Sequence, residues 1–286
     1  MRPSSSINGT AVASRRHVPA RCFDGHPADK TIRIAYLPDP VKVLSKPGYP
    51  EPSVRTRLQQ ECGMQFTQIT CRDIKTGKLG TEQFDLLCLP GGYAPNFEEK
   101  LGEKGRAAII KFVSDGGGFV GVCAGAYVGS NWGYGLLDVD LPYIDRWARG
   151  KTDYCALGFT PAAHELLGEP AKKNLDVRYC NGPLMVPCDA ATTTVHATFE
   201  TELRGRRNKY RAEMKGTAAI VSGVYGGAGG GKVVLISPHL ETSDERHRTI
   251  GAHALFRQLF RFAAGVLDSP PAAKPPTPVS AASAPE

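Results

Sequence analysis

A single cysteine stands between a strand-like run and a helix-like run, with neighbours that suit nucleophilic chemistry. Residues 119–122 are aromatic, β-branched or small and predict a buried strand, whereas residues 124–130 predict the start of a helix. Cys123 lies at the junction, with Gly121 and Gly125 two residues away on either side. This spacing is typical of a nucleophile elbow, a strained turn that leaves room only for small neighbours. The dipole at the helix N-terminus also favours a thiolate.

A histidine and a glutamate far along the chain could complete this chemistry. Considered alone, Cys123 could equally be a buried structural thiol beside packing glycines. His239 and Glu241 follow an apolar strand-like run and lie two residues apart, so both can share one face of an extended chain. A cysteine nucleophile needs a base for its proton, and the imidazole needs a carboxylate to fix its tautomer. We therefore expect Cys123, His239 and Glu241 to be catalytic.

Acyl transfer also needs hydrogen-bond donors for an oxyanion. The amide of Ala124 directly follows the nucleophile, and Gly92 has no side chain to hinder a close approach. We expect these two amides to hold the oxyanion. Gly91, Tyr127 and Asn181 are expected to contribute to substrate binding at the same site.

Strand-like and helix-like runs alternate along the chain and would position these residues. We expect strands at 31–37, 65–70, 84–89, 119–122, 175–180, 192–199, 218–225 and 232–237, and helices at 53–62, 98–115 and 242–267. This order predicts a mainly parallel sheet with right-handed crossovers, in which ligands bind beyond the carboxyl ends of strands. Gly92 and Cys123 both fall at such ends, which favours a functional thiol.

Two other stretches are less informative. Residues 136–147 and 154–159 are apolar and aromatic with mixed periodicity and give no clear element. The glycine-rich residues 226–231 predict a hairpin turn, because no helix with Lys-Ser/Thr follows as a phosphate-binding loop would require.

Length and composition limit the class of protein. The 286 residues, 41% of them hydrophobic, can bury one large core. No apolar run approaches the roughly 20 residues of a membrane span, and no secretory signal is recognisable. The net charge of +7 comes largely from basic clusters near the start and at 204–211 that are typical of solvated loops. We expect a small-molecule substrate and neither nucleic acid nor membrane as partner, with a homo-oligomer left open.

The eight cysteines indicate a reducing compartment. They form no C-x-x-C pair, and several lie within apolar runs. A zinc site can be drawn from Cys180 and Cys188 with His164 or His196, but its spacing matches no usual ligand pattern. We expect no metal, no cofactor and an intracellular, cytoplasmic protein.

The two ends of the chain differ from its middle. Residues 1–29 are rich in Ser, Arg and Pro and predict disorder, with a mitochondrial presequence as the alternative. Residues 269–286 are rich in Pro and Ala and predict a disordered tail. We expect residues 30–268 to form a single domain.

Three of these stretches resemble the class I glutamine amidotransferase-like superfamily. Pro90-Gly-Gly92 resembles its oxyanion-strand loop, Gly121–Gly125 its nucleophile elbow and Pro238-His-Leu-Glu241 its His-x-Glu motif. Longer runs at 119–130, 179–182 and 231–241 are similar to the biotin–protein ligase N-terminal domain family. The resemblance implies an α/β fold, a flavodoxin-like three-layer sandwich with a mainly parallel central sheet, and a Cys123–His239–Glu241 triad.

The resemblance implies a Cys-dependent hydrolase or glutamine amidotransferase-like enzyme that acts on a small amide. Neither a ligase catalytic domain nor an ammonia-acceptor domain is recognisable, so we expect neither biotinylation nor a complete amidotransferase. Two alternatives keep the same elbow. One is a ligand-binding or regulatory module without turnover, and the other is a redox or carbonyl-handling thiol protein.

Overall fold

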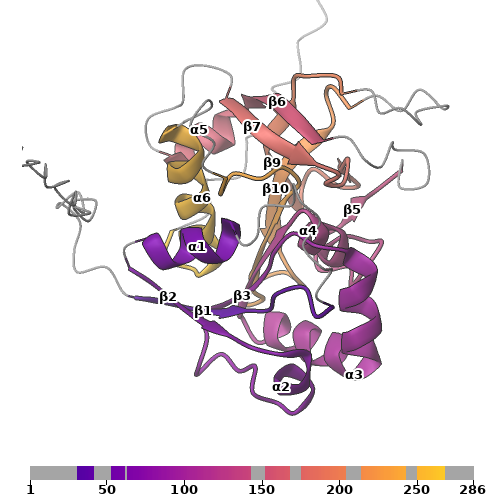
Figure 1. Ribbon diagram of the computed structural model, residues 1–286, viewed down its shortest axis with the longest axis vertical. Coiled ribbons are helices and arrows are strands. Elements are labelled where there is room, and N and C mark those ends of the chain that lie inside the picture. The colour runs from indigo at the N-terminus through magenta and orange to yellow at the C-terminus, as the bar shows by residue number, and fades with distance from the viewer. Residues whose placement is uncertain are drawn as a thin grey trace, which may run out of the picture.

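The computed structural model describes residues 31–41, 53–61, 63–142, 152–167, 175–203, 214–242 and 250–267. These residues form a central nine-stranded sheet (Figure 1). Its strands, in spatial order, are β2 (Met64–Gln68), β1 (Ile32–Tyr36), β3 (Leu86–Leu89), β4 (Gly118–Val122), β11 (Lys232–Ile236), β10 (Ala218–Val224), β9 (Thr193–Phe199), β6 (Thr152–Phe159) and β7 (Leu175–Cys180). A separate antiparallel pair consists of β5 (Val139–Asp140) and β8 (Val186–Pro187).

The sheet has a parallel half and an antiparallel half. Strands β2, β1, β3, β4 and β11 pair in parallel, and β10, β9, β6 and β7 follow with antiparallel pairing. In the parallel half Gly121 pairs with both Leu89 and Leu235, so β3, β4 and β11 end side by side. The predicted hairpin is confirmed, because Val224 pairs with Lys232 across residues 226–231.

Helices cover both faces of the sheet and give the predicted three-layer sandwich. They are α1 (Ser53–Gln60), α2 (Cys71–Lys75), α3 (Ala94–Ser114), α4 (Ala124–Gly129), α5 (Pro161–Leu167) and α6 (Ile250–Ala263). Side chains of β3 alternate between two cores: Leu86 and Cys88 face the core of α1 and α6, whereas Leu87 and Leu89 face the core of α2, α3 and α4. A strand that is buried on both faces explains this uninterrupted apolar run.

Several predicted boundaries are corrected. The helix expected from residue 98 begins at Ala94, because the proline that follows it fits the first helical turn, and the helix is broken at Gly102 (φ 57°, ψ −171°). The last helix was expected from residue 242. Its described part begins at Ile250, and residues 243–249 lie outside the described residues.

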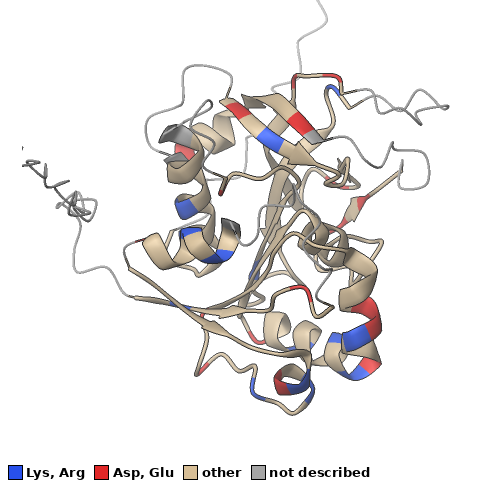
Figure 2. Cartoon of the chain, in the orientation of Figure 1, with Lys and Arg blue, Asp and Glu red and all other residues tan. Residues whose placement is uncertain are grey.

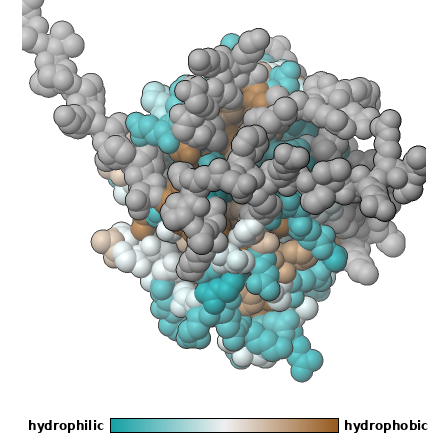
Figure 3. All heavy atoms as spheres, turned by 90° about the vertical axis from the view of Figure 1, so that its left-hand side faces the viewer, coloured by the Kyte–Doolittle hydropathy of each residue, from teal (hydrophilic) through white to brown (hydrophobic). Residues whose placement is uncertain are grey.

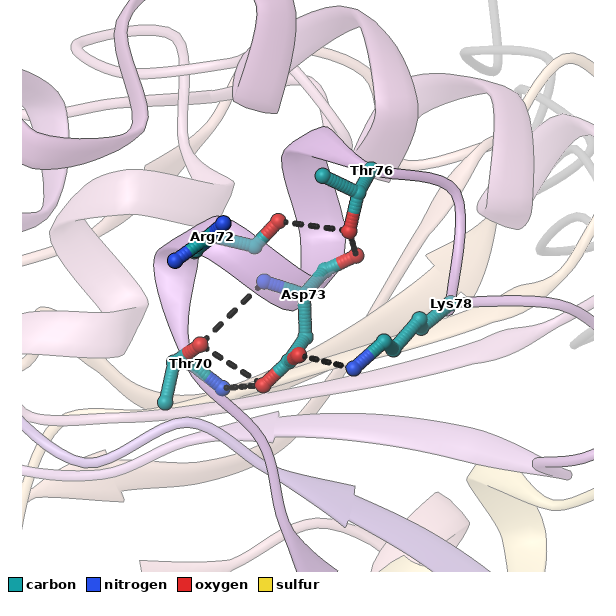
Figure 4. Close-up of polar contacts among 5 residues, drawn as sticks. All are labelled: Thr70, Arg72, Asp73, Thr76 and Lys78. Carbon is teal, nitrogen blue, oxygen red and sulfur yellow. Dashed lines mark hydrogen bonds and ion pairs between the residues drawn. The ribbon is translucent and has the colours of Figure 1, made fainter.

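Helix α2 was not expected at all, because five residues are too few to show a helical period. Its local signal is a capping box (Figure 4): the Asp73 amide donates to Thr70 Oγ1 at 3.1 Å, and the Thr70 amide donates to Asp73 Oδ2 at 3.0 Å. Lys78 Nζ donates to Asp73 Oδ1 at 2.7 Å. Hydrogen bonds from Lys78 and Thr70 lower the pKa of Asp73 to about 2.

Charged residues lie mostly on the helices and loops, and the central strands of the parallel half contain few (Figure 2). On the face drawn in Figure 3, the hydrophobic areas of the described surface are separated by hydrophilic ones. No helix of the described residues is long and apolar enough to cross a membrane.

Residues 1–30 and 268–286 lie outside the described residues, so the disorder predicted for both ends stays a prediction.

Candidate active site

Three neighbouring strands lead to the Gly91-Gly92 pair, to Cys123 and to the His239–Glu241 pair at one edge of the sheet. Strand β3 leads into the Gly91-Gly92 pair, β4 ends directly before Cys123, and β11 leads to His239 and Glu241. All three strands are parallel and adjacent, with β4 between the other two. The motifs therefore meet beyond the carboxyl ends of the strands, which is where α/β sheets bind their ligands.

Cys123 occupies a strained turn. Its φ of 50° and ψ of −101° lie outside the regions that L-residues usually adopt, and it is one of two non-glycine residues with positive φ in the described part of the chain. A Cβ on Gly121 would lie 2.4 Å from the Gly125 carbonyl oxygen, and one on Gly125 would lie 2.1 Å from that of Leu89. Both glycines are thus required by close backbone contacts, as the sequence pattern predicts for an elbow.

His239 and Glu241 form a tight, sheltered pair. The His239 Nδ1 atom lies 2.7 Å from Glu241 Oε1, with side-chain exposures of 14% and 1%. Burial alone would lower the pKa of the His239 imidazole, but the charges of Glu241 and Cys123 outweigh burial and hold this pKa well above its ordinary value. The His239 amide donates to the Arg178 carbonyl at 2.8 Å, which fixes the backbone of this segment on β7.

Gly91 lies between the thiol and the imidazole. A Cβ added there would stand 3.0 Å from His239 Cε1 and 3.6 Å from Cys123 Cβ. Any larger residue would therefore press on the imidazole and on the Cys123 side chain. Glycine at this position keeps the approach between Cys123 and His239 open.

The neighbouring Gly92 is held against an aspartate that sequence reasoning missed. A Cβ on Gly92 would lie 2.6 Å from Asp39 Oδ2. The same carboxylate accepts hydrogen bonds from the Tyr93 amide at 2.9 Å and from Asn96 Nδ2 at 2.9 Å, and so joins the end of β1 to the start of α3. Asp39 follows a parallel strand adjacent to β3, and this position was the signal that could have identified it.

The expected oxyanion donors follow the ends of two adjacent strands, β3 and β4. Ala124 opens α4 directly after Cys123, and Gly92 lies in the loop that follows β3. Within the described residues neither amide donates a hydrogen bond to a protein acceptor. Each amide is thus available to a bound group.

The end of β7 and the turn after it contact Cys123 and Tyr127. Cys123 Sγ lies 3.3 Å from the Cys180 carbonyl oxygen, and the Tyr127 hydroxyl donates to the Asn181 carbonyl at 3.0 Å. Asn181 has a φ of 56°, and a Cβ on the following Gly182 would lie 2.1 Å from the Ser237 carbonyl oxygen. Tyr127 and Asn181 thus contact each other, and a role for them in substrate binding stays a prediction.

The other described thiols lie in different surroundings. Burial raises the pKa of Cys71, takes that of Cys88 well above its ordinary value and raises that of Cys155 to about 12. Burial and hydrogen bonds with Asp138 and Asp140 raise the pKa of Cys188 to about 11. No group of three or more His, Cys, Asp or Glu side chains is placed to hold a metal ion in the part of the chain that the structure describes.

The comparisons with known proteins agree with the α/β fold predicted from the sequence. Residues 45–133 match a family model described as "Biotin-protein ligase, N terminal". The matched segment includes Gly92 and Cys123 and ends well before His239. Comparison with curated protein sequences gave no match.

Solved structures share the architecture at low sequence identity. A chain of the PurLQS structure from Thermotoga maritima superposes with a TM-score of 0.55 at 16% identity, over 81% of this chain and 99% of that one. A protein from Thermoplasma acidophilum, provisionally assigned as one component of a GMP synthase, gives 0.51 at 14% identity, over 82% of this chain and 96% of its own. A provisionally assigned ThuA-like protein from Bacteroides uniformis gives 0.51 at 13% identity, over 84% and 94%. At these identities the likeness shows the fold.

Proposed function

We propose that the protein is a cysteine-dependent hydrolase or amidotransferase-like enzyme that acts on a small amide. Cys123 is the nucleophile, His239 transfers the proton and Glu241 orients the imidazole. The amides of Gly92 and Ala124 hold the oxyanion. The solved structures support the fold alone, so the proposed function rests on the residues of this chain.

One observation carries the proposal. The strained Cys123 turn ends a strand whose two parallel neighbours lead to the Gly91-Gly92 loop and to the His239–Glu241 pair. A structural cysteine has no need of a strained backbone, a buried carboxylate–imidazole pair or a glycine between thiol and imidazole. A reacting thiol needs all three.

The reaction would proceed through an acyl-enzyme. The Cys123 thiolate attacks the amide carbonyl carbon, and the negative charge moves to the carbonyl oxygen between the two backbone amides. The His239 imidazolium then protonates the leaving nitrogen, the C–N bond breaks and a thioester remains. Water attacks the thioester while His239 takes its proton, which releases the acid and restores the thiolate.

Electrostatics support this division of roles. The negative charges of Glu241 and Cys123 both favour a protonated His239, which suits an imidazolium that waits beside a thiolate. Glu241 is almost fully buried, so its carboxylate acts on the imidazole through a medium of low dielectric constant. The carboxylate also fixes which ring nitrogen faces the thiol.

The proposal is tested by ammonia release from a panel of small primary amides, glutamine included. The wild-type protein should release ammonia from at least one amide. Cys123→Ser and His239→Ala should abolish release, and Glu241→Gln should slow it by about 10- to 1,000-fold through poor imidazole orientation. Ligand-induced stabilisation without turnover or a Cys123 adduct would instead support a binding module.

A further inference from the structure

A carboxylate contacts the loop that is expected to hold the oxyanion. Asp39 lies shortly after the end of β1, the strand next to β3. Its Oδ2 atom accepts a hydrogen bond from the Tyr93 amide at 2.9 Å. Its Oδ1 atom accepts one from Asn96 Nδ2 at 2.9 Å and one from the Val41 amide at 3.0 Å. The carboxylate thus holds the residue that directly follows Gly92.

Consecutive residues of this loop pack on the reacting groups and on Asp39. A Cβ on Gly91 would stand 3.0 Å from His239 Cε1 and 3.6 Å from Cys123 Cβ. A Cβ on Gly92 would stand 2.6 Å from Asp39 Oδ2 and 2.9 Å from Asp39 Cβ. Because both contacts are close, the position of the Asp39 side chain helps to set where the loop lies relative to Cys123.

Asp39 also completes the N-terminus of helix α3 from outside the helix. Tyr93 is the N-cap residue, its side chain makes no capping hydrogen bond, and the first turn contains no acidic residue. In a capping box, a side chain at the third helical position accepts the N-cap amide. Here Asn96 has that position and donates to Asp39, which accepts the Tyr93 amide instead. The Tyr93 amide is therefore committed to Asp39, and the Gly92 amide is the donor that the loop can offer to a bound group.

We propose that Asp39 is a positioning residue for the proposed reaction, and that it fixes the Gly92 amide where this amide binds the oxyanion formed at Cys123. The inference rests on the proposed function, which assigns the oxyanion to the amides of Gly92 and Ala124. Loss of one oxyanion donor typically slows a reaction by about 100- to 1,000-fold, and a donor that is displaced rather than removed should cost less. We therefore expect the loss of Asp39 to weaken oxyanion binding by about tenfold.

The charge of Asp39 and its positioning role predict opposite effects. A carboxylate near an oxyanion repels it, so removal of the charge alone would strengthen oxyanion binding. Removal of the contacts with Tyr93 and Asn96 releases the loop and would weaken it. Asp39→Asn removes the charge with little change in size and places an NH₂ group against donors that now face a carboxylate oxygen. The direction of its effect therefore separates the two roles.

The test compares two reactions of Cys123 that differ in their need for an oxyanion site. Acetaldehyde labelled with ¹³C at its carbonyl carbon adds to the thiolate: an S–C bond forms, the carbonyl π-electrons move to the oxygen, and this oxyanion takes the proton of the His239 imidazolium to give a hemithioacetal. Iodoacetamide instead loses iodide from a saturated carbon and forms no oxyanion. NMR spectroscopy gives the dissociation constant of the hemithioacetal, whose signal is assigned by its loss in Cys123→Ser, and peptide mapping gives the alkylation rate.

Asp39→Ala should raise the dissociation constant of the hemithioacetal about tenfold, and Asp39→Asn should raise it about threefold. Both variants should leave the alkylation rate of Cys123 within about twofold of wild type, because that reaction does not use the Gly92 amide. Asp115→Ala is the matched control and should change neither quantity. It removes a carboxylate from the other end of α3, where Asp115 forms an exposed ion pair with Lys111.

An unchanged or lowered dissociation constant in folded Asp39→Ala would overturn the inference, as would an alkylation rate that falls as much as aldehyde binding does. If Asp39→Ala does not fold, Asp39→Asn decides, and aldehyde binding that is as tight as in wild type or tighter would overturn the inference. A failure of the proposed function gives a different result. Wild-type protein that forms the hemithioacetal but hydrolyses no amide would contradict the proposed function and leave the effect of Asp39 measurable, whereas wild-type protein that forms no hemithioacetal would overturn both.

Discussion

At the scale of single residues, the site depends on backbone positions that admit no Cβ. Gly125 is the clearest case, because a Cβ there would overlap the backbone carbonyl of Leu89, which cannot move without distorting β3. A Cβ on Gly129, in the same short helix, would lie 2.5 Å from Leu235 Cδ2, the end of a side chain that can turn away. The two glycines share helix α4 and differ in what surrounds them.

This contrast predicts different costs for the same substitution. Gly125→Ala should lower the free energy of unfolding by about 1–3 kcal/mol more than Gly129→Ala, because the gain in helix propensity is the same in both and only the overlap differs. Urea unfolding of the two variants measures the difference. Equal stability of both variants would contradict the close contact between Gly125 and the Leu89 backbone.

The geometry of single residues could be predicted from the sequence where it follows a local spacing. The two glycines around Cys123 and the His239–Glu241 pair each lie within a few residues of one another and therefore form readable patterns. Asp39 carries no such pattern, because its partners Tyr93 and Asn96 are distant in sequence and only the fold brings them together.

At the scale of elements, the loop between β3 and α3 depends on an anchor from β1. Asp39→Ala should remove the acceptor of the Tyr93 amide and of Asn96 and lower the free energy of unfolding by about 1–3 kcal/mol. Asp115→Ala is the matched control. It breaks an exposed i,i+4 ion pair with Lys111 at 2.8 Å and should cost about 0.5 kcal/mol or less. Urea unfolding distinguishes the two, and equal losses would contradict the anchoring role of Asp39.

The strands could be predicted better than the segments that connect them. Both faces of β3 and β4 are buried, so their sequences are continuous apolar runs with clear ends. The short β5, paired with β8 outside the main sheet, lies in a stretch whose apolar and aromatic residues show no single period. Tertiary packing rather than local pattern decides the structure there.

At the scale of the whole molecule, a buried histidine ties stability to pH. His196 on β9 is fully buried, with its Nε2 2.7 Å from Ser222 Oγ on β10. Burial lowers its pKa to about 4, against an ordinary value of 6.5. Between these two values the unfolded chain binds more protons than the folded one, so stability falls as the pH drops from 6.5 to about 4.

Over this pH range the free energy of unfolding of the wild-type protein should therefore fall by about 3 kcal/mol more than that of a His196→Gln variant. The amide of that variant can still contact Ser222. The His239 imidazole does not interfere. Its pKa is raised in the folded state, so its contribution to the free energy of unfolding changes only above pH 6.5, the ordinary pKa of histidine. Urea unfolding at several pH values gives the comparison. Parallel pH profiles of the two proteins would show that His196 takes up its proton without unfolding.

The central claim is that His239 and Glu241 make Cys123 a nucleophile, and the rate of its alkylation by iodoacetamide against pH tests this most directly. Cys123 should still be alkylated at pH 6, ahead of the buried Cys88 and Cys155, and its rate in His239→Ala should fall at least about tenfold, towards that of an ordinary thiol. Peptide mapping by mass spectrometry assigns each rate to its residue. Wild-type and His239→Ala proteins with the same Cys123 rate at pH 6 would contradict the account.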